Sequence, residues 1–368
     1  EKGRENLLLQ SNQFDTTWVT ASTSLTSGQS GYDGTNDAWL LEVTATGSYR
    51  RVYQGGINLD VNTFSIYAKA NTSNFLFLLN NKSSTDAVAW FDLSNGSIGG
   101  VNGAIDTKIE SVGNGWYRCS VTSIFADNQY FVSVADGIGD VNGTIGASLY
   151  IQDAQLEAGL VATDYIETGA STAQAGILED MPRLDYSGGA SCPALLLEPQ
   201  RRNVLAHSEY LNGWNTISAI TIEANTDETL SPEGKYNAYK TTAIGGGTQR
   251  LYDVISVAAG SITMSMYVKA GTEDQIRLLT TASTFDITYD LTNETKIEDV
   301  GTGTIEPVGN GWYRISATGT SAGGTEVPQV RHLGTAGSSE YQYWYGIQIE
   351  EGSYPTSYIP TYGSSVTR

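Results

Sequence analysis

The chain has 368 residues, enough for two or three domains that each bury a hydrophobic core. It contains 41 Gly and 22 Tyr, as β-rich extracellular proteins do, and its 40 acidic and 20 basic residues give a formal net charge of −20. Such a surface repels nucleic acid and anionic membranes, so we expect neither as a partner. No apolar run approaches the roughly 18 residues that a spanning helix needs, which predicts no membrane insertion.

Two Gly-rich loops of the first half contain pairs of aspartates. The segment 31–39, GYDGTNDAW, and the segment 133–143, SVADGIGDVNG, both follow this pattern. Ca²⁺ takes several oxygen ligands from a bendable backbone, although neither spacing matches the twelve-residue EF-hand loop. Asx-rich turns of β-proteins have the same composition, so the turn remains the alternative. The calcium candidates are Asp33, Asp37, Asp136 and Asp140.

The stretch 64–70, FSIYAKA, alternates with a period of two, as a half-buried strand does. Its apolar side consists of Phe64, Ile66 and Ala68, which we expect to point into a core. The sequence GNG at 113–115 supplies the positive-φ positions of a tight hairpin turn before the next strand.

That next strand, WYRCSV at 116–121, places Tyr117, Cys119 and Val121 on the inward side. Cys119 then acts as a small apolar core residue. Cys192 lies far along the chain in a Gly/Ser-rich segment. Two such cysteines do not form a disulfide framework, so we expect both to be free thiols.

The second half of the chain repeats the first. VGNGWYR at 112–118 recurs at 308–314, and FSIYAKA recurs as MSMYVKA at 264–270. Further matches link the first and last segments of each half, with small drifts in spacing that loop insertions explain. The predicted organisation is a first module over residues 1–170, a linker over 171–202 and a second module over 203–368.

Each predicted module consists of short alternating strands separated by Gly, Asn, Asp and Ser turns, without an amphipathic helix of more than two turns. This pattern predicts an all-β protein: two tandem jelly-roll β-sandwich domains joined by an irregular linker.

The outward side of the predicted strands contains aromatic residues next to cations in both modules. Sugar rings stack on aromatic faces while their hydroxyls need fixed hydrogen-bond partners, so this pattern is typical of glycan binding. The alternative is that Trp and Arg stack on one another and merely cover the sheet. The candidates are Trp116, Arg118, Tyr67, Lys69, Trp312, Arg314, Tyr267, Lys269 and Arg250.

The densest aromatic segment is SEYQYWYGIQIE near the end of the second module. Its residues Tyr343, Trp344, Tyr345 and Gln348 are candidates for a sugar platform. A subunit contact and a simple core strand are the alternatives.

Catalytic signals are weak. The chain has only two histidines, His207 and His332, and it contains no HExxH, GxSxG or P-loop motif. Carboxylate pairs are common in so acidic a chain, so a pair alone does not indicate a glycosidase. We therefore expect that the chain is not an enzyme.

Several short motifs follow one another in a fixed order along the chain. They are N-L-L-x-x-S, S-x-Y-x-K-A, F/Y-D-L-S/T-N, G-N-G-W-Y-R, A/I-Q-L/I-E-x-G and T-x-Y-I-x-T, and they recur in both halves. Together these motifs resemble the jelly-roll, carbohydrate-binding-like domains of bacteriophage virion proteins such as head fibres and tail spikes. One departure is Ile151, which stands where the second module has Trp344.

The resemblance implies a structural virion protein at the virion surface or in the extracellular space, with weak binding to host glycans. Its implied partners are other virion proteins and cell-surface or mucus polysaccharide, and by analogy with phage fibres it would form a homotrimer. One alternative is a pair of carbohydrate-binding modules from a larger secreted enzyme. Another is a polysaccharide depolymerase.

Overall fold

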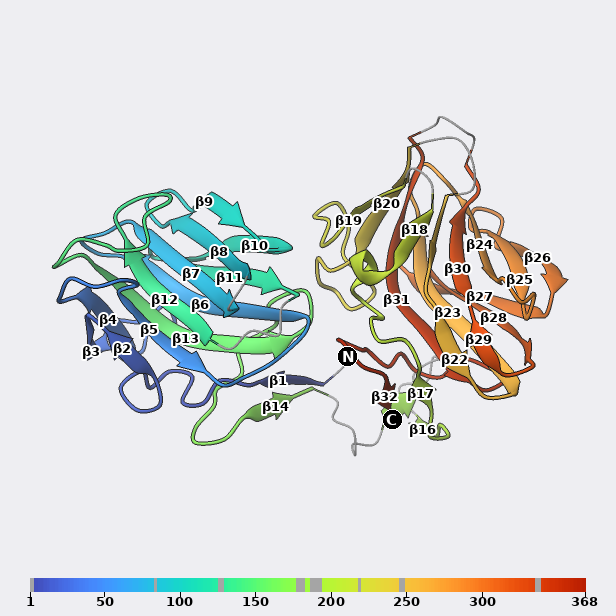
Figure 1. Ribbon diagram of the computed structural model, residues 1–368, viewed down its shortest axis with the longest axis horizontal. Coiled ribbons are helices and arrows are strands. Elements are labelled where there is room, and N and C mark those ends of the chain that lie inside the picture. Colours follow the sequence, from blue (N-terminus) through green and yellow to red (C-terminus); the bar gives the residue numbers. More distant parts are fainter. Residues whose placement is uncertain are drawn as a thin grey trace. The chain divides into compact units, whose positions relative to one another are not determined.

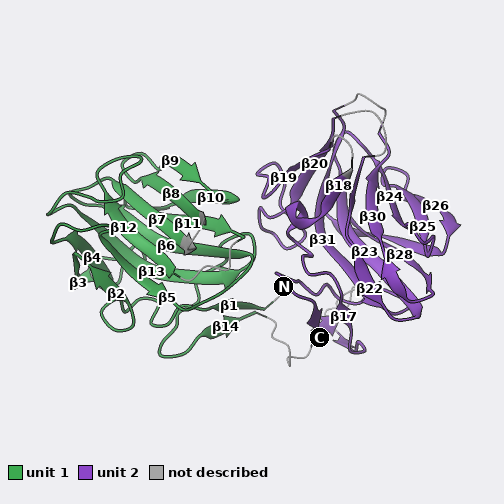
Figure 2. Cartoon of the chain, in the orientation of Figure 1, with its two compact units in different colours: residues 1–178 green, residues 179–368 purple. Residues whose placement is uncertain are grey.

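The computed structural model describes residues 3–82, 85–124, 129–176, 183–185, 194–217, 220–244, 249–334 and 339–368. The chain forms two compact units, residues 1–178 and 179–368 (Figure 2). In the described ranges every regular element is a β-strand except one short 3₁₀ helix, Leu211–Gly213. The all-β prediction is confirmed. Within those ranges no helix is long and apolar enough to cross a membrane.

Unit 1 is a sandwich of two six-stranded antiparallel sheets (Figure 1). The first sheet has the order β10-β11-β6-β13-β4-β3. Its strands are β3 (Thr23–Gln29), β4 (Ala38–Val43), β6 (Asn62–Ala70), β10 (Asp106–Gly113), β11 (Trp116–Ser123) and β13 (Ser148–Ala158).

The second sheet of unit 1 has the order β2-β5-β12-β7-β8-β9. Its strands are β2 (Val19–Ala21), β5 (Arg51–Gly55), β7 (Phe75–Lys82), β8 (Thr85–Asp92), β9 (Ser97–Asn102) and β12 (Gln129–Ala135). A separate pair joins β1 (Arg4–Asn6) to β14 (Ala173–Ala175). The start of the predicted linker is thus paired with the first strand of the unit.

Unit 2 repeats this plan strand for strand. Its first sheet has the order β19-β20-β31-β23-β28-β27, with β17 and β32 added at β31, and its second sheet has the order β18-β21-β30-β24-β25-β26. The strands of the first sheet are β17 (Arg202–Asn203), β19 (Ile220–Glu223), β20 (Tyr239–Ala243), β23 (Gly260–Ala270), β27 (Thr302–Gly309), β28 (Trp312–Ser321), β31 (Tyr341–Glu351) and β32 (Val366–Thr367).

The strands of the second sheet are β18 (Asn215–Ile217), β21 (Arg250–Tyr252), β24 (Gln275–Thr280), β25 (Asp286–Asp290), β26 (Thr295–Val300) and β30 (Pro328–His332). Two small pairs complete the unit: β15 (Arg183–Asp185) with β16 (Ala194–Leu196), and β22 (Ile255–Val257) with β29 (Gly324–Glu326).

The repeated GNG sequences form the predicted hairpin turns. In both units the three residues, 113–115 and 309–311, have positive φ, and they join β10 to β11 and β27 to β28. Glycine flanks the one asparagine because this left-handed backbone region disfavours most side chains.

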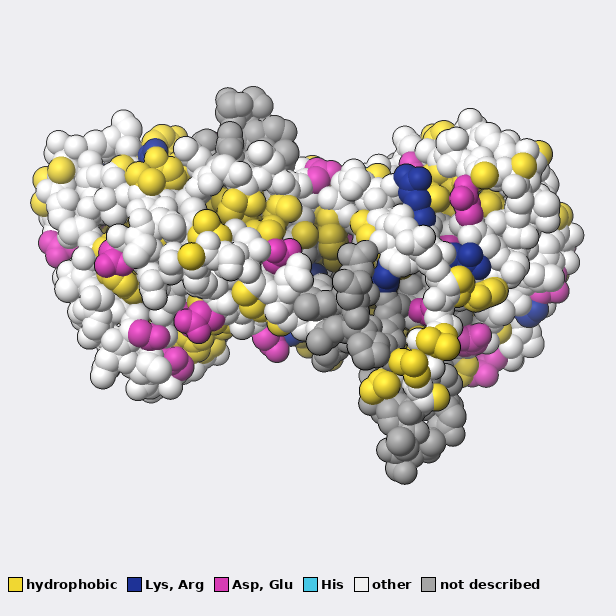
Figure 3. Space-filling view, turned by 90° about the horizontal axis from the view of Figure 1, so that it is seen from below, with side chains coloured by type: hydrophobic (Ala, Val, Ile, Leu, Met, Phe, Trp, Pro, Cys, Tyr) yellow, Lys and Arg dark blue, Asp and Glu magenta, His cyan; other side chains and the backbone are white. Residues whose placement is uncertain are grey.

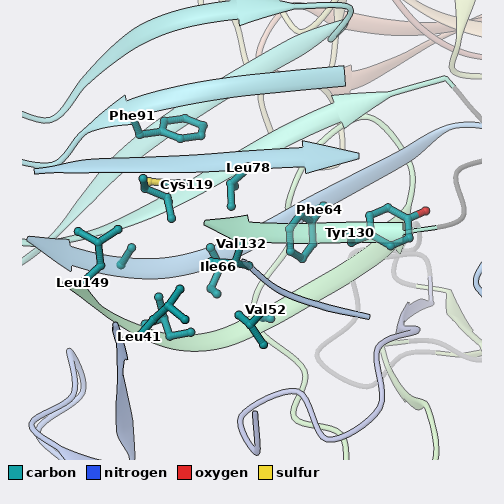
Figure 4. Close-up of a cluster of buried hydrophobic side chains, with 14 of the residues drawn as sticks. Leu41, Val52, Phe64, Ile66, Leu78, Phe91, Cys119, Tyr130, Val132 and Leu149 are labelled. Atoms are coloured by element: carbon teal, nitrogen blue, oxygen red, sulfur yellow. The ribbon is translucent and has the colours of Figure 1, made fainter. Parts of the chain in front are cut away.

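The core of unit 1 lies between its two sheets and contains the residues that the period-two pattern predicts. Phe64, Ile66, Ala68, Cys119 and Val121 are fully buried there. Figure 4 shows side chains from both sheets meeting in this layer. Cys119 is a free cysteine, and burial raises the pKa of its thiol well above the usual value. The other cysteine, Cys192, lies outside the described residues.

Acidic side chains are scattered over the face of the molecule in Figure 3, in agreement with the net charge of −20. Hydrophobic side chains appear on the same face in several separate groups.

Candidate functional site

Each unit has a group of aromatic rings on the outward side of its first sheet, away from the core. The aromatic cluster of unit 1 consists of Tyr32, Tyr67, Trp116, Tyr150 and Tyr165. The aromatic cluster of unit 2 consists of Tyr267, Trp312, Tyr341, Tyr343, Tyr345 and Tyr358. Strand alternation places these rings opposite the core residues, so the predicted direction of Trp116, Tyr67 and their counterparts is right.

These outward-facing rings are nevertheless largely buried. Trp116 is only 1% exposed and Tyr67 is 8% exposed, because Tyr32 covers both. The Tyr32 ring stacks on Tyr67 at 4.0 Å with an interplanar angle of 5°, and its centroid lies 6.3 Å from that of Trp116. Tyr32 itself is half-buried. One of the half-buried rings of the cluster, Tyr32, therefore comes from the loop before β4, which sequence alternation cannot locate.

The predicted arginines pack onto tyrosine rings in both units. The Arg118 guanidinium lies 5.4 Å from the Tyr67 ring centroid and donates to Ser65 Oγ at 3.1 Å. Arg314 lies in the same way 5.6 Å from the Tyr267 ring. These arginines stack on tyrosine rings, whereas the alternative expectation was that they stack on the tryptophans.

The predicted lysines lie on the same outward side and are half-buried. Lys269 donates from Nζ to Thr229 Oγ1 at 3.0 Å, and Trp312 donates from its indole to Leu230 O at 2.9 Å. In unit 1, Lys69 lies opposite Trp116 in the β6–β11 register. A covering loop thus reaches the outward face of unit 2 as well.

A β-bulge in β13 places a carboxylate inside the aromatic cluster of unit 1. Pairing with β6 shifts between Gln152 and Gln155, and the bulged residue, Asp153, has φ 52°. Asp153 is 6% exposed, and the Tyr32 hydroxyl donates to its Oδ2 at 2.9 Å. Burial raises the pKa of Asp153 to about 6, despite hydrogen bonds from Tyr32 and Tyr165 that lower it.

Polar groups from the loop before β4 form hydrogen bonds with Gln152 of β13 and with one another near this carboxylate. Gln152 Nε2 donates to Asp37 Oδ1 at 2.8 Å, and Gln152 Oε1 accepts from the Tyr32 backbone N–H at 3.1 Å. Thr35 donates to Asp33 Oδ1 from both its backbone N–H and its hydroxyl. Asp33 and Asp37 are exposed at the rim of the cluster.

The second pair of calcium candidates lies in a different loop. Asp136 accepts two hydrogen bonds from the Thr144 backbone N–H, at 2.9 and 2.8 Å. Asp140 accepts from the backbone N–H groups of Asp136 and Asn142. Asp33, Asp136 and Asp140 thus fix turns, whereas Asp37 accepts from Gln152 on β13. The described residues contain no group of three or more His, Cys, Asp or Glu placed to hold a metal. The calcium site stays a prediction.

Trp344 does not form an exposed platform for a sugar ring. It is 0% exposed inside unit 2, where its ring stacks on His332 at 5.0 Å and its indole donates to Gln342 Oε1 at 3.0 Å. Gln348 is also buried, and its Oε1 accepts from the Ile359 backbone N–H at 2.6 Å. Sequence alternation misses this because β31 has aromatic residues on both sides.

The neighbours of Trp344 on β31 point outward but are buried and already paired. Tyr343 donates to Glu228 Oε2 at 2.6 Å, and Tyr345 donates to Glu233 Oε2 at 2.8 Å. Glu209 also accepts from Tyr345, at 3.2 Å. Burial raises the pKa of the Tyr345 hydroxyl well above its usual value. The carboxylates of unit 2 therefore occupy the hydroxyls of Tyr343 and Tyr345, while the Tyr267, Tyr341 and Tyr358 rings are half-buried.

Arg250 belongs to neither aromatic cluster. It lies on β21 in the second sheet of unit 2, where its guanidinium is 5.8 Å from the Tyr252 ring centroid. Sequence reasoning also missed Tyr32, Asp153 and Glu209. The sequence did contain a signal for Asp153: it aligns with Gly346 of the second copy, and a glycine there indicates a positive-φ position.

No protein-family model matches this sequence, and no curated protein matches it. Among solved structures, the N-terminal CBM22-1–CBM22-2 tandem domain of Xyn10C from Paenibacillus barcinonensis is 11% identical with a TM-score of 0.29, over 96% of this chain and 99% of that chain. An exo-β-1,3-galactanase from Phanerochaete chrysosporium, with β-1,3-galactotriose, is 7% identical with a TM-score of 0.25, over 89% and 69%.

A third structure, of carbohydrate-binding modules from the β-sandwich superfamily, is 13% identical with a TM-score of 0.24, over 77% of this chain and 97% of that chain. Identities and TM-scores this low carry no argument about function.

Proposed function

We propose that the chain is a carbohydrate-binding protein that holds a neutral sugar ring at the aromatic cluster of unit 1. The observation that carries this proposal is Asp153, a carboxylate with little access to solvent beneath the half-buried Tyr32. Carboxylates whose pKa is raised by burial concentrate at functional sites.

Asp153 is unfavourable for folding in two ways. Its φ of 52° is a left-handed conformation that costs a non-glycine residue about 1 kcal/mol. Burial also penalises its charged form at neutral pH, since its pKa is about 6. The sheet does not need a carboxylate here, because Gly346 occupies the matching bulge of unit 2 with φ 58°. A ligand-binding role accounts for a residue that stability alone disfavours.

The surroundings of Asp153 fit a sugar. The half-buried rings of Tyr32 and Tyr150 offer apolar faces for the C–H side of a pyranose. Asp153 and the exposed carboxylates of Asp33 and Asp37 offer acceptors for its hydroxyls. A few convergent polar groups beside aromatic faces are what a small-ligand site requires.

The test is a glycan array followed by calorimetric titration of the best neutral oligosaccharide with the full chain. We expect Tyr32→Ala to weaken binding by at least about tenfold, since one of the half-buried rings of the cluster is lost. Tyr32→Phe keeps the ring and removes the hydroxyl that holds Asp153, so a smaller loss is expected. Tyr354→Ala removes a half-exposed tyrosine of unit 2 and serves as the matched control.

Unchanged affinity in Tyr32→Ala, with the wild-type unfolding midpoint, would contradict the proposal. So would an array without any neutral glycan bound.

The biological setting is a separate proposal. The sequence motifs support a place on a phage particle, at the virion surface, and the carbohydrate-binding proposal fits equally a module pair of a larger secreted enzyme. Light scattering of the purified chain distinguishes them: a trimer that persists on dilution supports the fibre, and a monomer supports the module pair.

A further inference from the structure

Three arginines lie side by side on the outward face of the second sheet of unit 2. Arg331 on β30 is directly opposite Arg250 on β21 and directly opposite Arg277 on β24. Residues in such register have Cβ atoms about 5 Å apart, so the three form a row across adjacent strands, here called the arginine ladder. Like charges in this arrangement repel one another, in a chain that has only 20 basic residues.

The positive charge of the ladder is only partly balanced. Arg277 is paired with Asp286 through two hydrogen bonds of 2.6 Å, and Asp299 lies 3.8 Å away. Among the described residues, no carboxylate lies within ion-pair distance of Arg250 or Arg331. Burial and the two neighbouring arginines lower the pKa of Arg331. Asp286 partly offsets this repulsion at Arg331, and the folded unit keeps two cations without a direct ion pair next to each other.

A buried amide sits at the centre of the ladder. Gln329, which is 1% exposed, accepts at Oε1 from Arg250 Nη1 at 3.1 Å and from Arg331 Nη2 at 2.7 Å. These two donors fix which side of the amide faces the guanidiniums. Its Nε2 has no hydrogen-bond partner among the described residues. A buried donor without a partner is costly, and an arriving acceptor would relieve that cost.

Unit 1 shows that the fold does not require these residues. In the matching register Ser133 replaces Arg331, Phe77 replaces Arg277 and Phe131 replaces Gln329. Arg51 is the remaining cation, and its guanidinium lies 4.1 Å from the Phe131 ring centroid. One sandwich therefore covers this face with aromatic rings, whereas the other places cations on it.

We propose that the arginine ladder binds an oxyanion of an acidic polysaccharide. Guanidinium groups bind planar oxyanions through paired hydrogen bonds, and two of them meet here at one amide. The half-buried Tyr252 ring, next to Arg250 on the same strand face, offers an apolar surface for the sugar that bears the anion. The net charge of −20 disfavours a polynucleotide, whose charge is far denser than that of a spaced acidic sugar.

This site is independent of the aromatic cluster of unit 1, because it lies in the other unit and takes a charged ligand. Its test uses the full chain and three probes in calorimetric titrations: an oligogalacturonate, the same oligosaccharide with its carboxylates methyl-esterified, and a sulfated oligosaccharide. The ester is the matched control, since it removes the charge and keeps the sugar. Comparing the affinities for the sulfated probe and the oligogalacturonate shows whether the natural oxyanion is a sulfate ester or a uronate carboxylate.

We expect at least one anionic probe to bind, the methyl ester to bind at least about tenfold more weakly, and Arg331→Gln to lose at least about tenfold in affinity. Arg51→Gln, at the position of unit 1 that matches Arg250, should leave binding unchanged. Arg331→Gln should unfold at the same or a higher temperature than wild type, because it relieves repulsion. If Arg331→Gln unfolds at a lower temperature than wild type, the affinity of Arg250→Gln is measured in its place.

Two results would overturn the proposal. One is that neither anionic probe binds at low salt. The other is that a folded ladder variant binds as tightly as wild type.

Discussion

The two units have the same β-sandwich and differ at positions where the fold accepts more than one kind of residue. At the bulge of β13 unit 1 has Asp153, and at the matching bulge of β31 unit 2 has Gly346, both with positive φ. Around Asp153 the tyrosines leave a carboxylate with a raised pKa at a half-open cluster. Around Gly346 the tyrosine hydroxyls are taken by Glu209 and Glu233. The repeat thus conserves the backbone feature and changes its chemistry.

The cores of the two units also differ in the side chains that fill one end. In unit 2, Trp344 stacks on His332, whose ring nitrogens contact Glu273 and Thr241. In unit 1 the matching inward positions of Trp344 and His332 are the aliphatic Ile151 and Val134, both fully buried. A buried polar network and an aliphatic layer are therefore alternative fillings of one fold.

The largest expected effect is that of Trp344→Ala. Removing a fully buried Trp should lower the free energy of unfolding of unit 2 by about 3–5 kcal/mol, measured by denaturant titration. Ile151→Ala in unit 1 is the matched change and should cost about 2–4 kcal/mol. A loss below about 0.5 kcal/mol for Trp344→Ala would indicate an exposed ring and contradict the core assignment.

A smaller effect is expected from His332→Val, which puts the unit 1 residue into unit 2. It leaves the buried Glu273 with only its backbone donors, at Leu333 and Gly334, so we expect a loss of about 2–4 kcal/mol. Ser73 of unit 1 aligns with Glu273. The double variant His332→Val with Glu273→Ser therefore reproduces the unit 1 residues Val134 and Ser73 and should recover part of this loss. If the losses in free energy of unfolding of the two single variants simply add up in the double variant, the comparison of the two cores is contradicted. Denaturant titrations measure these losses.

The smallest effect, and the only gain, is expected from Asp153→Asn. The folded pKa of about 6 lies above the ordinary 3.8, so the folded chain holds a proton that the unfolded chain releases. Stability therefore falls as the pH rises from about 4 to 6 and stays low above that range. The variant should lack this slope and gain up to about 3 kcal/mol at pH 7, with little difference below pH 4.

Thermal unfolding of both proteins across this pH range measures the gain. A variant that is less stable than wild type at pH 7 would show that the Asp153 charge stabilises the cluster.

The sequence could predict what strand alternation determines. Phe64, Ile66 and Cys119 alternate with polar residues, so their burial followed from the period of two. The duplicated GNG turns and the repeat itself were equally local signals. The all-β sandwich was therefore predictable from short segments alone.

The candidate site was not predictable in the same way. In β31 the residues Tyr343, Trp344 and Tyr345 are all aromatic, so alternation cannot tell the inward ring from the outward ones. Tyr32 covers Trp116 from a loop far away in the sequence, and such long-range contacts leave no periodic signal. The ladder residue Arg331 pairs across strands whose register the sequence does not specify.

The measurement that tests the central claim most directly is a calorimetric titration of the full chain with its neutral oligosaccharide, wild type beside Asp153→Gly. The variant gives unit 1 the bulge residue of unit 2, and glycine suits the positive φ, so it should fold. We predict one sugar bound per wild-type chain and a loss of at least about tenfold in the variant. Two equivalent sites per chain, or unchanged affinity in Asp153→Gly, would contradict the claim that unit 1 binds the sugar through Asp153.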